Sequence, residues 1–243
     1  GYVDEIKNIC KRKKIYLIED TAWGIGAMFK KKFLGTLGDI GTFSFDFAKT
    51  MTTGEGGMLL FKNKNFFLKA KAWHDHGHEN NPRVPRWEDT RSSSGFNYRM
   101  TELQGAVGIS QLVKFNKIFN THKKNKNVIL KRLKKFKNLK MREIPKNSTD
   151  ASESLIFAFK NRRLAKDFRL NFLKKGFSTK ILPEALTWHF AGKWTHIKEL
   201  DIKKDNYFIK SLNKIDKYVS LQIFYKMDKN YPNRIEQTIK DIL

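Results

Sequence analysis

Short apolar runs alternate with helix-like segments along most of the 243-residue chain, and this alternation constrains the fold more than any other feature. The first run, Ile15-Tyr16-Leu17-Ile18, is short and favours a strand, and Glu19-Asp20 follow it directly. It therefore predicts a buried parallel strand that carries acidic residues to its carboxyl end. Further strands are predicted over residues 39–45, 57–61 and 155–159, and helices over 65–74, 101–119, 161–175, 206–212 and 233–243. Such alternation is typical of α/β proteins.

A change in composition near residue 120 predicts a second domain. The chain holds 49 lysine and arginine residues against 24 acidic ones, which gives a net charge of +25. Residues 111–180 alone hold 21 basic and 4 acidic side chains, so most of the excess lies in this segment. We therefore predict two domains, residues 1–120 and residues 121–243.

A positive charge of this size suggests a nucleic-acid partner, but the kind of basic residue argues against a specific one. Lysine makes up 38 of the 49 basic residues, whereas recognition of phosphates and bases with defined geometry prefers arginine. No zinc-finger, RNP or basic-zipper pattern accompanies the lysines. We predict a solvated lysine-rich surface and no specific nucleic-acid partner, and a surface for an anionic partner stays open as the alternative.

Several other classes of protein are not expected. The sequence holds no run of about 18 apolar residues, so neither a membrane span nor a membrane partner is predicted. It opens with no signal peptide, and the single cysteine, Cys10, excludes an internal disulfide framework and a cysteine-only zinc site. These features favour a cytoplasmic location. His74, His76 and His78 alternate but lack a distant fourth ligand, so we predict no metal site and expect a loop near a substrate instead.

Asp20, Ser44 and Lys49 are the residues with the most suggestive chemistry. Asp20 ends the first predicted strand, Ser44 lies late in the second, and Lys49 follows in a turn. A desolvated lysine beside a sheet edge can form an imine with an aldehyde, and a carboxylate can pair with a protonated pyridine nitrogen. Together with a hydroxyl for phosphate, these are the parts of a pyridoxal phosphate site. Individually, each residue also has an ordinary interpretation as a solvated lysine, a helix cap or a turn residue.

Five segments follow one another in a distinctive order: Glu19-Asp20-Thr21-Ala22 and residues 35–41, 42–45, 49–58 and 95–104. Their order and spacing resemble those of the DegT/DnrJ/EryC1/StrS aminotransferases, which are pyridoxal-phosphate enzymes acting mostly on nucleotide-linked keto sugars. The resemblance implies a fold-type I transferase. Its three-layer α/β/α cofactor domain would be represented in part by residues 1–120, and a smaller C-terminal α+β domain by residues 121–243.

The resemblance also implies a role for each matching residue. Lys49 would bind the cofactor as an imine and then move a proton between the two carbon centres. Asp20 would keep the pyridine nitrogen protonated, and Ser44 would bind the phosphate. Asn97 and Arg99 would reach the phosphate region of the neighbouring subunit's site, so a homodimer with shared active sites is implied.

The chain also departs from the family pattern. Trp23, a further cofactor-binding candidate, stands where relatives usually carry glutamine or histidine, and Asp46 stands where many have histidine. The Phe45-Asp46-Phe47 context resembles the branch that aminates an eight-carbon octulosonate. By analogy, His76 and His189 are expected to contact the substrate. A family member would carry more of the cofactor domain before Glu19-Asp20, so we expect the sequence to be an N-terminally truncated fragment.

These observations predict an aminotransferase that moves an amino group from an amino acid, expected to be L-glutamate, to a keto or aldehyde sugar. The products expected are nucleotide sugars or 8-amino-octulosonate for surface polysaccharide such as lipopolysaccharide. One alternative is a sugar dehydratase of the same family, although known dehydratases of that kind replace the imine lysine, here Lys49, with histidine. Another alternative is a basic binding fragment without catalysis.

Overall fold

The structure is a computed structural model that describes residues 2–200 and 206–243, and its contacts divide the chain into two compact units. Unit 1 comprises residues 1–117 and 144–151, and unit 2 comprises residues 118–143 and 152–243. The prediction from composition divides the chain once, at residue 120, and so places residues 144–151 in the second domain. The contacts place them in unit 1. This return has a simple physical cause, because a strand in that segment pairs with a strand of unit 1.

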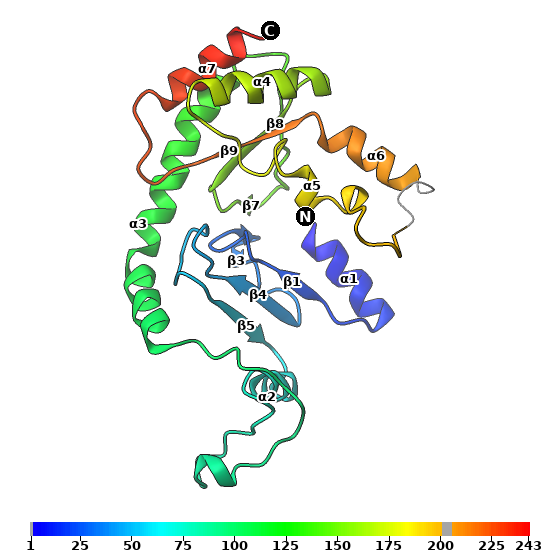
Figure 1. The fold of residues 1–243 in the computed structure, drawn as a ribbon, viewed down its shortest axis with the longest axis vertical. Coiled ribbons are helices and arrows are strands. Elements are labelled where there is room, and N and C mark those ends of the chain that lie inside the picture. Colours follow the sequence, from blue (N-terminus) through cyan, green and yellow to red (C-terminus); the bar gives the residue numbers. More distant parts are fainter. Residues whose placement is uncertain (1, 201–205) are drawn as a thin grey trace. The chain divides into compact units, whose positions relative to one another are not determined.

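Unit 1 is built on two small sheets (Figure 1). In the first sheet, the central strand β4 (Ile40–Ser44) pairs in parallel with β1 (Ile18–Asp20) and antiparallel with β5 (Gly57–Phe61). In the second, β2 (Met28–Phe29) lies between β3 (Lys32–Phe33) and β7 (Ser148–Thr149). The helices of this unit are α1 (Val3–Lys13), α2 (Lys64–Trp73) and the short 3-10 helix η1 (Arg86–Glu88).

The predicted burial of the first strand is wrong, although its position is right. Tyr16 and Ile18 are 67% and 59% exposed, and Met58 and Leu59 on β5 are each 50% exposed. The reason is that β1 is an edge strand of a three-stranded sheet, and α1, which precedes it, buries none of its own residues. An apolar run predicts a strand through its local preference, but burial depends on what packs over it.

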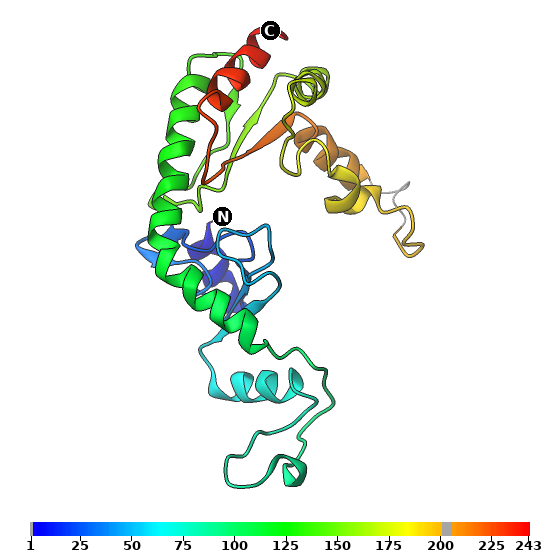
Figure 2. The same cartoon turned by 60° about the vertical axis from the view of Figure 1, so that its left-hand side comes forward.

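The helix predicted over residues 101–119 is longer in the structure, where α3 (Glu102–Leu133) runs on through residue 120 (Figure 2). The change from a mixed to a lysine-rich composition does not interrupt it, because backbone hydrogen bonds continue regardless of side-chain charge. Among residues 2–200 and 206–243, no helix is both long and apolar enough to cross a membrane.

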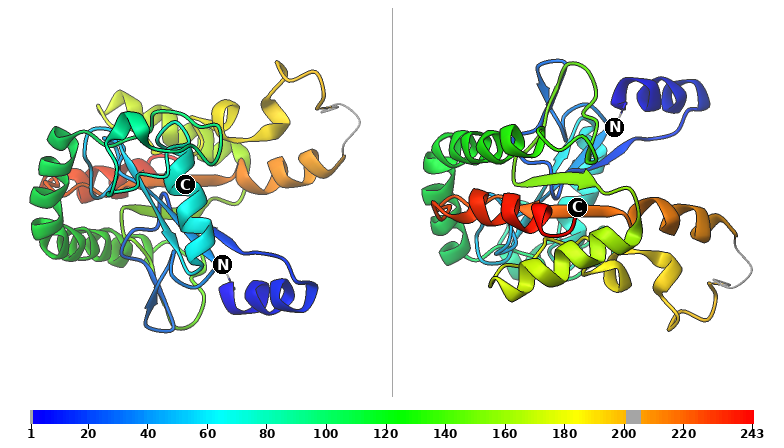
Figure 3. Two further views of the ribbon diagram at one scale, coloured as in Figure 1. Left: turned by 90° about the horizontal axis from the view of Figure 1, so that it is seen from below. Right: turned by 90° about the horizontal axis from the view of Figure 1, so that it is seen from above.

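Unit 2 is an antiparallel sheet with two helices packed against it. The strand order is β6 (Lys140–Met141), β8 (Ser154–Ala158) and β9 (Tyr218–Gln222). The helices α4 (Arg162–Lys174) and α7 (Tyr231–Lys240) lie side by side (Figure 3). Phe157, Phe168, Phe172 and Ile235 are fully buried in the core that they form. Each such side chain stabilises the unit by about 1.5–3 kcal/mol relative to exposure.

The remaining helices of unit 2 are short. They are α5 (Leu186–His189), the 3-10 helix η2 (Ala191–Lys193) and α6 (Asn206–Ile215). The predicted strand at 155–159 and the predicted helices at 161–175, 206–212 and 233–243 therefore all exist, with ends shifted by a few residues. The strands β6 and β9 were not predicted from the sequence.

Candidate functional site

The parallel pairing of β1 and β4 places Asp20 and Ser44 at one edge of the sheet. Asp20 is the last residue of β1 and lies opposite Thr42, and Ser44 ends β4 two residues further on. The Asp20 Oδ1 atom accepts a hydrogen bond from the Ala22 N–H at 3.1 Å, and the Ser44 Oγ atom accepts one from the Asp46 N–H at 3.4 Å. Both side chains are thus oriented by the backbone that leaves their own strand.

Lys49 contacts Trp23 at the same edge of the sheet. The turn that carries Lys49 is closed by Asp46, whose carboxylate accepts the Ala48 N–H at 2.7 Å and whose carbonyl accepts the Lys49 N–H at 3.0 Å. The Lys49 Nζ atom lies 3.4 Å from the centroid of the Trp23 ring. A cation over an indole face is attracted by the ring quadrupole. The loop after β1 and the turn after β4 are therefore joined at this contact.

The Thr-Gly segment after Lys49 folds back onto Phe45 and fixes the turn. The Thr53 N–H donates to the Phe45 carbonyl at 2.9 Å, and the Thr52 hydroxyl donates to the same carbonyl at 3.2 Å. The Gly54 N–H donates to Thr52 Oγ1 at 2.9 Å, with Gly54 in the left-handed region at φ +84°. These bonds hold both ends of the loop that presents Lys49.

Glu19 has a structural function that sequence reasoning missed. Its carboxylate accepts three backbone N–H groups, from Gly35 at 2.9 Å, Leu37 at 2.6 Å and Gly38 at 2.5 Å. Gly35 has φ +86°, a conformation that glycine adopts without strain. Glu19 therefore anchors the glycine-rich loop to the strand that ends at Asp20. In the sequence, the pair Gly35 and Gly38 was the only indication of this loop. Only the fold shows that Glu19 is the acid that accepts their N–H groups.

A buried carboxylate, Asp75, organises the long loop after α2. It is 3% exposed and accepts two hydrogen bonds from Arg86, at 2.7 and 3.0 Å, and one from Arg99 at 2.7 Å. The hydrogen bonds from Arg86 hold the pKa of Asp75 well below its ordinary value, and the charges of Arg86 and Arg99 add to this. Asp75 also forms an isolated antiparallel bridge with Asn97. Asn97 and Arg99 are thus positioned by a residue of their own chain.

Residues 75–95, which include two of the three histidines expected in a loop, are irregular apart from η1, and these two histidines differ in environment. His76 is exposed with φ +56°, and its backbone N–H donates to the Phe96 carbonyl at 3.0 Å. His78 is buried, and its Nδ1 atom lies 3.4 Å from the Asp89 carboxylate. Within the described residues, no group of three His, Cys, Asp or Glu side chains is arranged to hold a metal ion.

His189 belongs to the other unit. It is the last residue of α5, and its side chain is exposed. Asp20, Trp23, Ser44 and Lys49 lie together at one sheet edge of unit 1. A shared site between His189 and those residues stays a prediction.

Comparison with known proteins finds one family model that matches nearly the whole chain. Residues 2–239 match the model described as the DegT/DnrJ/EryC1/StrS aminotransferase family. The GDP-perosamine synthase of Caulobacter vibrioides is 39% identical over 110 residues, which cover 45% of this chain and 28% of that protein. The UDP-4-amino-4,6-dideoxy-N-acetyl-beta-L-altrosamine transaminase of Campylobacter jejuni is 30% identical over 158 residues, which cover 64% of this chain and 41% of that protein.

Solved structures agree on the fold. The Helicobacter pylori aminotransferase PseC superimposes with a TM-score of 0.84 at 17% identity, covering 100% of this chain and 63% of that one. An aminotransferase from Psychrobacter cryohalolentis gives a TM-score of 0.81 at 23% identity, covering 98% of this chain and 64% of that one. The predicted fold class is confirmed by these structures. The chain spans less than two thirds of the length of each of these four proteins.

Proposed function

The chain belongs to the DegT/DnrJ/EryC1/StrS aminotransferase family, and we propose that it acts in a pyridoxal-phosphate-dependent transfer of an amino group from an amino acid to a keto or aldehyde sugar. The observation that carries this proposal is the placement of Lys49, Asp20 and Ser44 at one edge of the sheet, where β1 and β4 end. A primary amine, a carboxylate and a hydroxyl are the three kinds of group that this cofactor needs.

The residues at this edge fit pyridoxal phosphate chemically. Lys49 would bind it covalently through Nζ, Asp20 would accept a hydrogen bond from its ring nitrogen, and Ser44 would donate to its phosphate. When bound, the cofactor supplies an electron sink for the substrate carbon. The chain prepares these groups in advance, because backbone N–H groups already orient the carboxylate of Asp20 and the hydroxyl of Ser44.

Trp23 contributes an aromatic surface where relatives usually have a hydrogen-bonding side chain. The Lys49 Nζ atom lies 3.4 Å from the ring centroid, so the lysine side chain rests over the indole face. We propose that Trp23 holds the Lys49 side chain at the sheet edge before the cofactor binds and packs against the cofactor ring afterwards. This role requires the ring but no polar atom of the side chain.

The finer proposals concern substrate, partner and location. Two relatives are named for perosamine and altrosamine, which supports an amino-sugar product of the kind used in surface polysaccharide. We propose a nucleotide-linked sugar or an octulosonate as acceptor, contacted by His76 and His189, with L-glutamate as donor in the cytoplasm. Asn97 and Arg99 would serve the partner subunit's site in a homodimer. The Asp75 bonds support this by fixing the segment that carries both residues.

The domain assignment is proposed on the same basis. Residues 1–120 would form the C-terminal part of the cofactor domain and residues 121–243 the small domain. Support comes from the site residues of the sheet edge, which all lie in unit 1, and from the separate core of unit 2.

The test is the half-reaction with the amino donor, which needs no knowledge of the sugar. The chain loaded with pyridoxal phosphate is mixed with L-glutamate, and 2-oxoglutarate is measured. About one equivalent per chain is expected, with none from Lys49→Ala. The matched control is Lys69→Ala, an exposed lysine on α2, which should leave the yield unchanged. Equal yields from Lys49→Ala and the native chain would refute the assignment of Lys49.

A further inference from the structure

A hollow of about 810 Å³ in unit 2 is lined by four lysines, and we call it the lysine pocket. The lysines are Lys140, Lys160, Lys214 and Lys217. The pocket belongs wholly to unit 2 and contains none of the residues at the sheet edge described above. Its volume lies in the range of small-molecule sites, about 300–1,000 Å³.

The sheet register explains why these residues meet. Lys140 on β6 lies opposite Ala158, and Ala158 lies opposite Tyr218 on β9, so all three form a row across one end of the sheet. Lys160 follows the end of β8 and Lys217 precedes the start of β9. The Phe159 N–H donates to the Lys217 carbonyl at 3.0 Å, which ties these two segments together.

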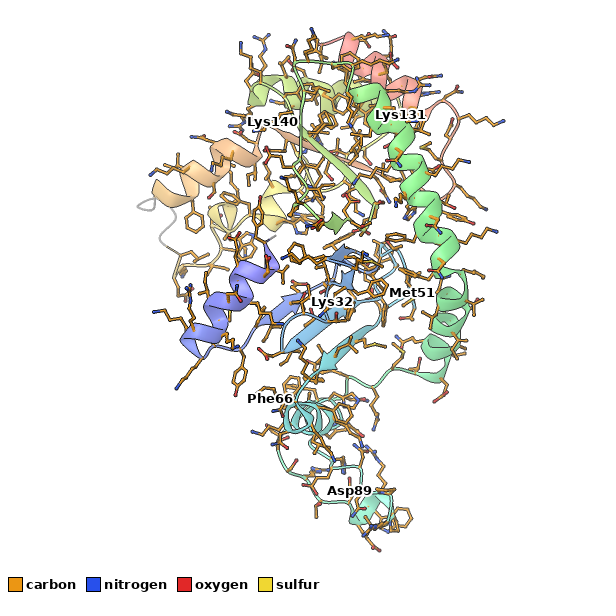
Figure 4. The ribbon with its side chains drawn as sticks, turned by 180° about the vertical axis from the view of Figure 1, so that it is seen from behind. Lys32, Met51, Phe66, Asp89, Lys131 and Lys140 are labelled. Atoms are coloured by element: carbon orange, nitrogen blue, oxygen red, sulfur yellow. The ribbon has the colours of Figure 1, made fainter. Side chains whose placement is uncertain are left out.

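The fourth lysine comes from a helix. Lys214 lies in the last turn of α6, beside Asn213, which also lines the pocket. Figure 4 shows Lys140 close to the end of this helix. Four lysines from one strand, the segments next to two others and a helix thus line one hollow.

The four lysine charges of the pocket are only partly balanced. Its lining includes no acidic side chain, and the α-carboxylate of the last residue, Leu243, can offset at most one of the four charges. Lys140 lies 3.9 Å from Glu143, but both side chains are largely exposed and such pairs contribute little. Asp216 precedes Lys217 but faces Arg162 at 3.9 Å. In the described part of the chain, Lys160, Lys214 and Lys217 form no ion pair. An anion in the pocket would relieve the repulsion among the four cations.

The rest of the lining suggests a compact ligand with a non-polar part. Leu164 and Leu243 supply apolar surface, and the Asn138 and Asn213 amides supply donors and acceptors. Single-stranded nucleic acid needs a long groove with successive exposed aromatic platforms. The aromatic residues of the lining are instead the buried Phe159, which is 3% exposed, and the half-buried Tyr218. We propose that the lysine pocket binds a small molecule that carries two or more phosphate groups. Lysine binds phosphate as a point charge and does not require the fixed geometry of arginine.

The test is a calorimetric titration of the 243-residue chain at low and at physiological salt. The probes are inorganic triphosphate, ATP, adenosine and a 20-nucleotide DNA strand. Triphosphate and ATP should bind with one site per chain, and adenosine should not. Tighter binding of ATP than of triphosphate identifies a ligand whose organic part also contacts the pocket, and equal binding identifies a purely inorganic one.

The variant Lys160→Ala/Lys214→Ala removes two exposed lysines of the pocket and should weaken triphosphate binding by about tenfold or more. Its matched control is Lys166→Ala/Lys174→Ala, which removes two exposed lysines of α4 outside the pocket. Each single variant is measured as well, so that a folding defect in the pair does not hide the result. Equal weakening in the control, no binding of triphosphate at low salt, or tighter binding of DNA than of triphosphate would overturn the proposal.

Discussion

Removing the Glu19 carboxylate should release the glycine-rich loop that it anchors. In Glu19→Ala, the N–H groups of Gly35, Leu37 and Gly38 lose their acceptor. Gly35 and Gly38 are buried and Leu37 is half-buried, so water replaces the carboxylate poorly. An unsatisfied buried donor costs about 1–3 kcal/mol, and three at the lower end of that range cost about 3 kcal/mol.

This cost should appear as local opening measured by hydrogen exchange of the loop amides. A difference of about 3 kcal/mol corresponds to exchange faster by roughly 100-fold, since each 1.4 kcal/mol is a factor of ten. Glu19→Gln keeps one acceptor oxygen and should give an intermediate rate. Glu88→Ala makes the same change of charge at an exposed position in the same unit and should leave the loop unchanged. Similar exchange in Glu19→Ala and Glu88→Ala would refute the reasoning.

The remaining predictions concern three side chains. Trp23→Ala should weaken binding of pyridoxal phosphate several-fold, measured by absorbance titration, whereas Trp23→Phe keeps a ring and should lose less. Asp75→Asn should speed proteolysis of the loop at neutral pH. Because the folded pKa of Asp75 is depressed, its stabilisation is complete above the ordinary value of 3.8. It is lost as the pH falls from there through the lowered pKa, below which variant and native chain should converge. Burial of His122 lowers its pKa, and the charge of Lys180 adds to this effect. Because the buried ring resists protonation, unit 2 should lose stability as the pH falls below about 6.5, and less so in His122→Gln.

Each of these predictions has a result that contradicts it. Equal affinity of Trp23→Ala and Trp23→Phe for pyridoxal phosphate would show that the ring contributes nothing. Proteolysis of Asp75→Asn at the native rate at pH 7 would show that the bonds from Arg86 and Arg99 do not hold the loop. A melting temperature of unit 2 that falls equally with pH in the native chain and in His122→Gln would place the titration elsewhere.

The sequence was sufficient for features that depend on neighbours along the chain. Strands β4, β5 and β8 follow from short apolar runs, and the turn that carries Lys49 follows from polar and glycine residues after β4. Asp20 was expected at the end of one strand and Ser44 late in the next, and they hold these positions on β1 and β4. These features depend on residues that are close in the sequence or on the pairing of just two strands.

Features that depend on distant residues could not be predicted. The acceptor for Gly35, Leu37 and Gly38 lies 16 to 19 residues earlier in the chain, and Asp75 is bound by arginines 11 and 24 residues later. The pairing of β7 with β2 returns residues 144–151 to unit 1 across more than a hundred residues. The composition of a segment does not indicate which residue will pair with a charged side chain. It also does not indicate which strand a short segment will pair with.

If Lys49 binds pyridoxal phosphate covalently, the attachment site can be mapped on the chain. The chain is incubated with pyridoxal phosphate, reduced with borohydride, digested and analysed by peptide mass spectrometry. We expect a reduced pyridoxyl group on Lys49 alone at one equivalent per chain, absent in Lys49→Ala and retained in Lys69→Ala. Modification spread over the surface lysines, or the same yield in Lys49→Ala, would contradict it.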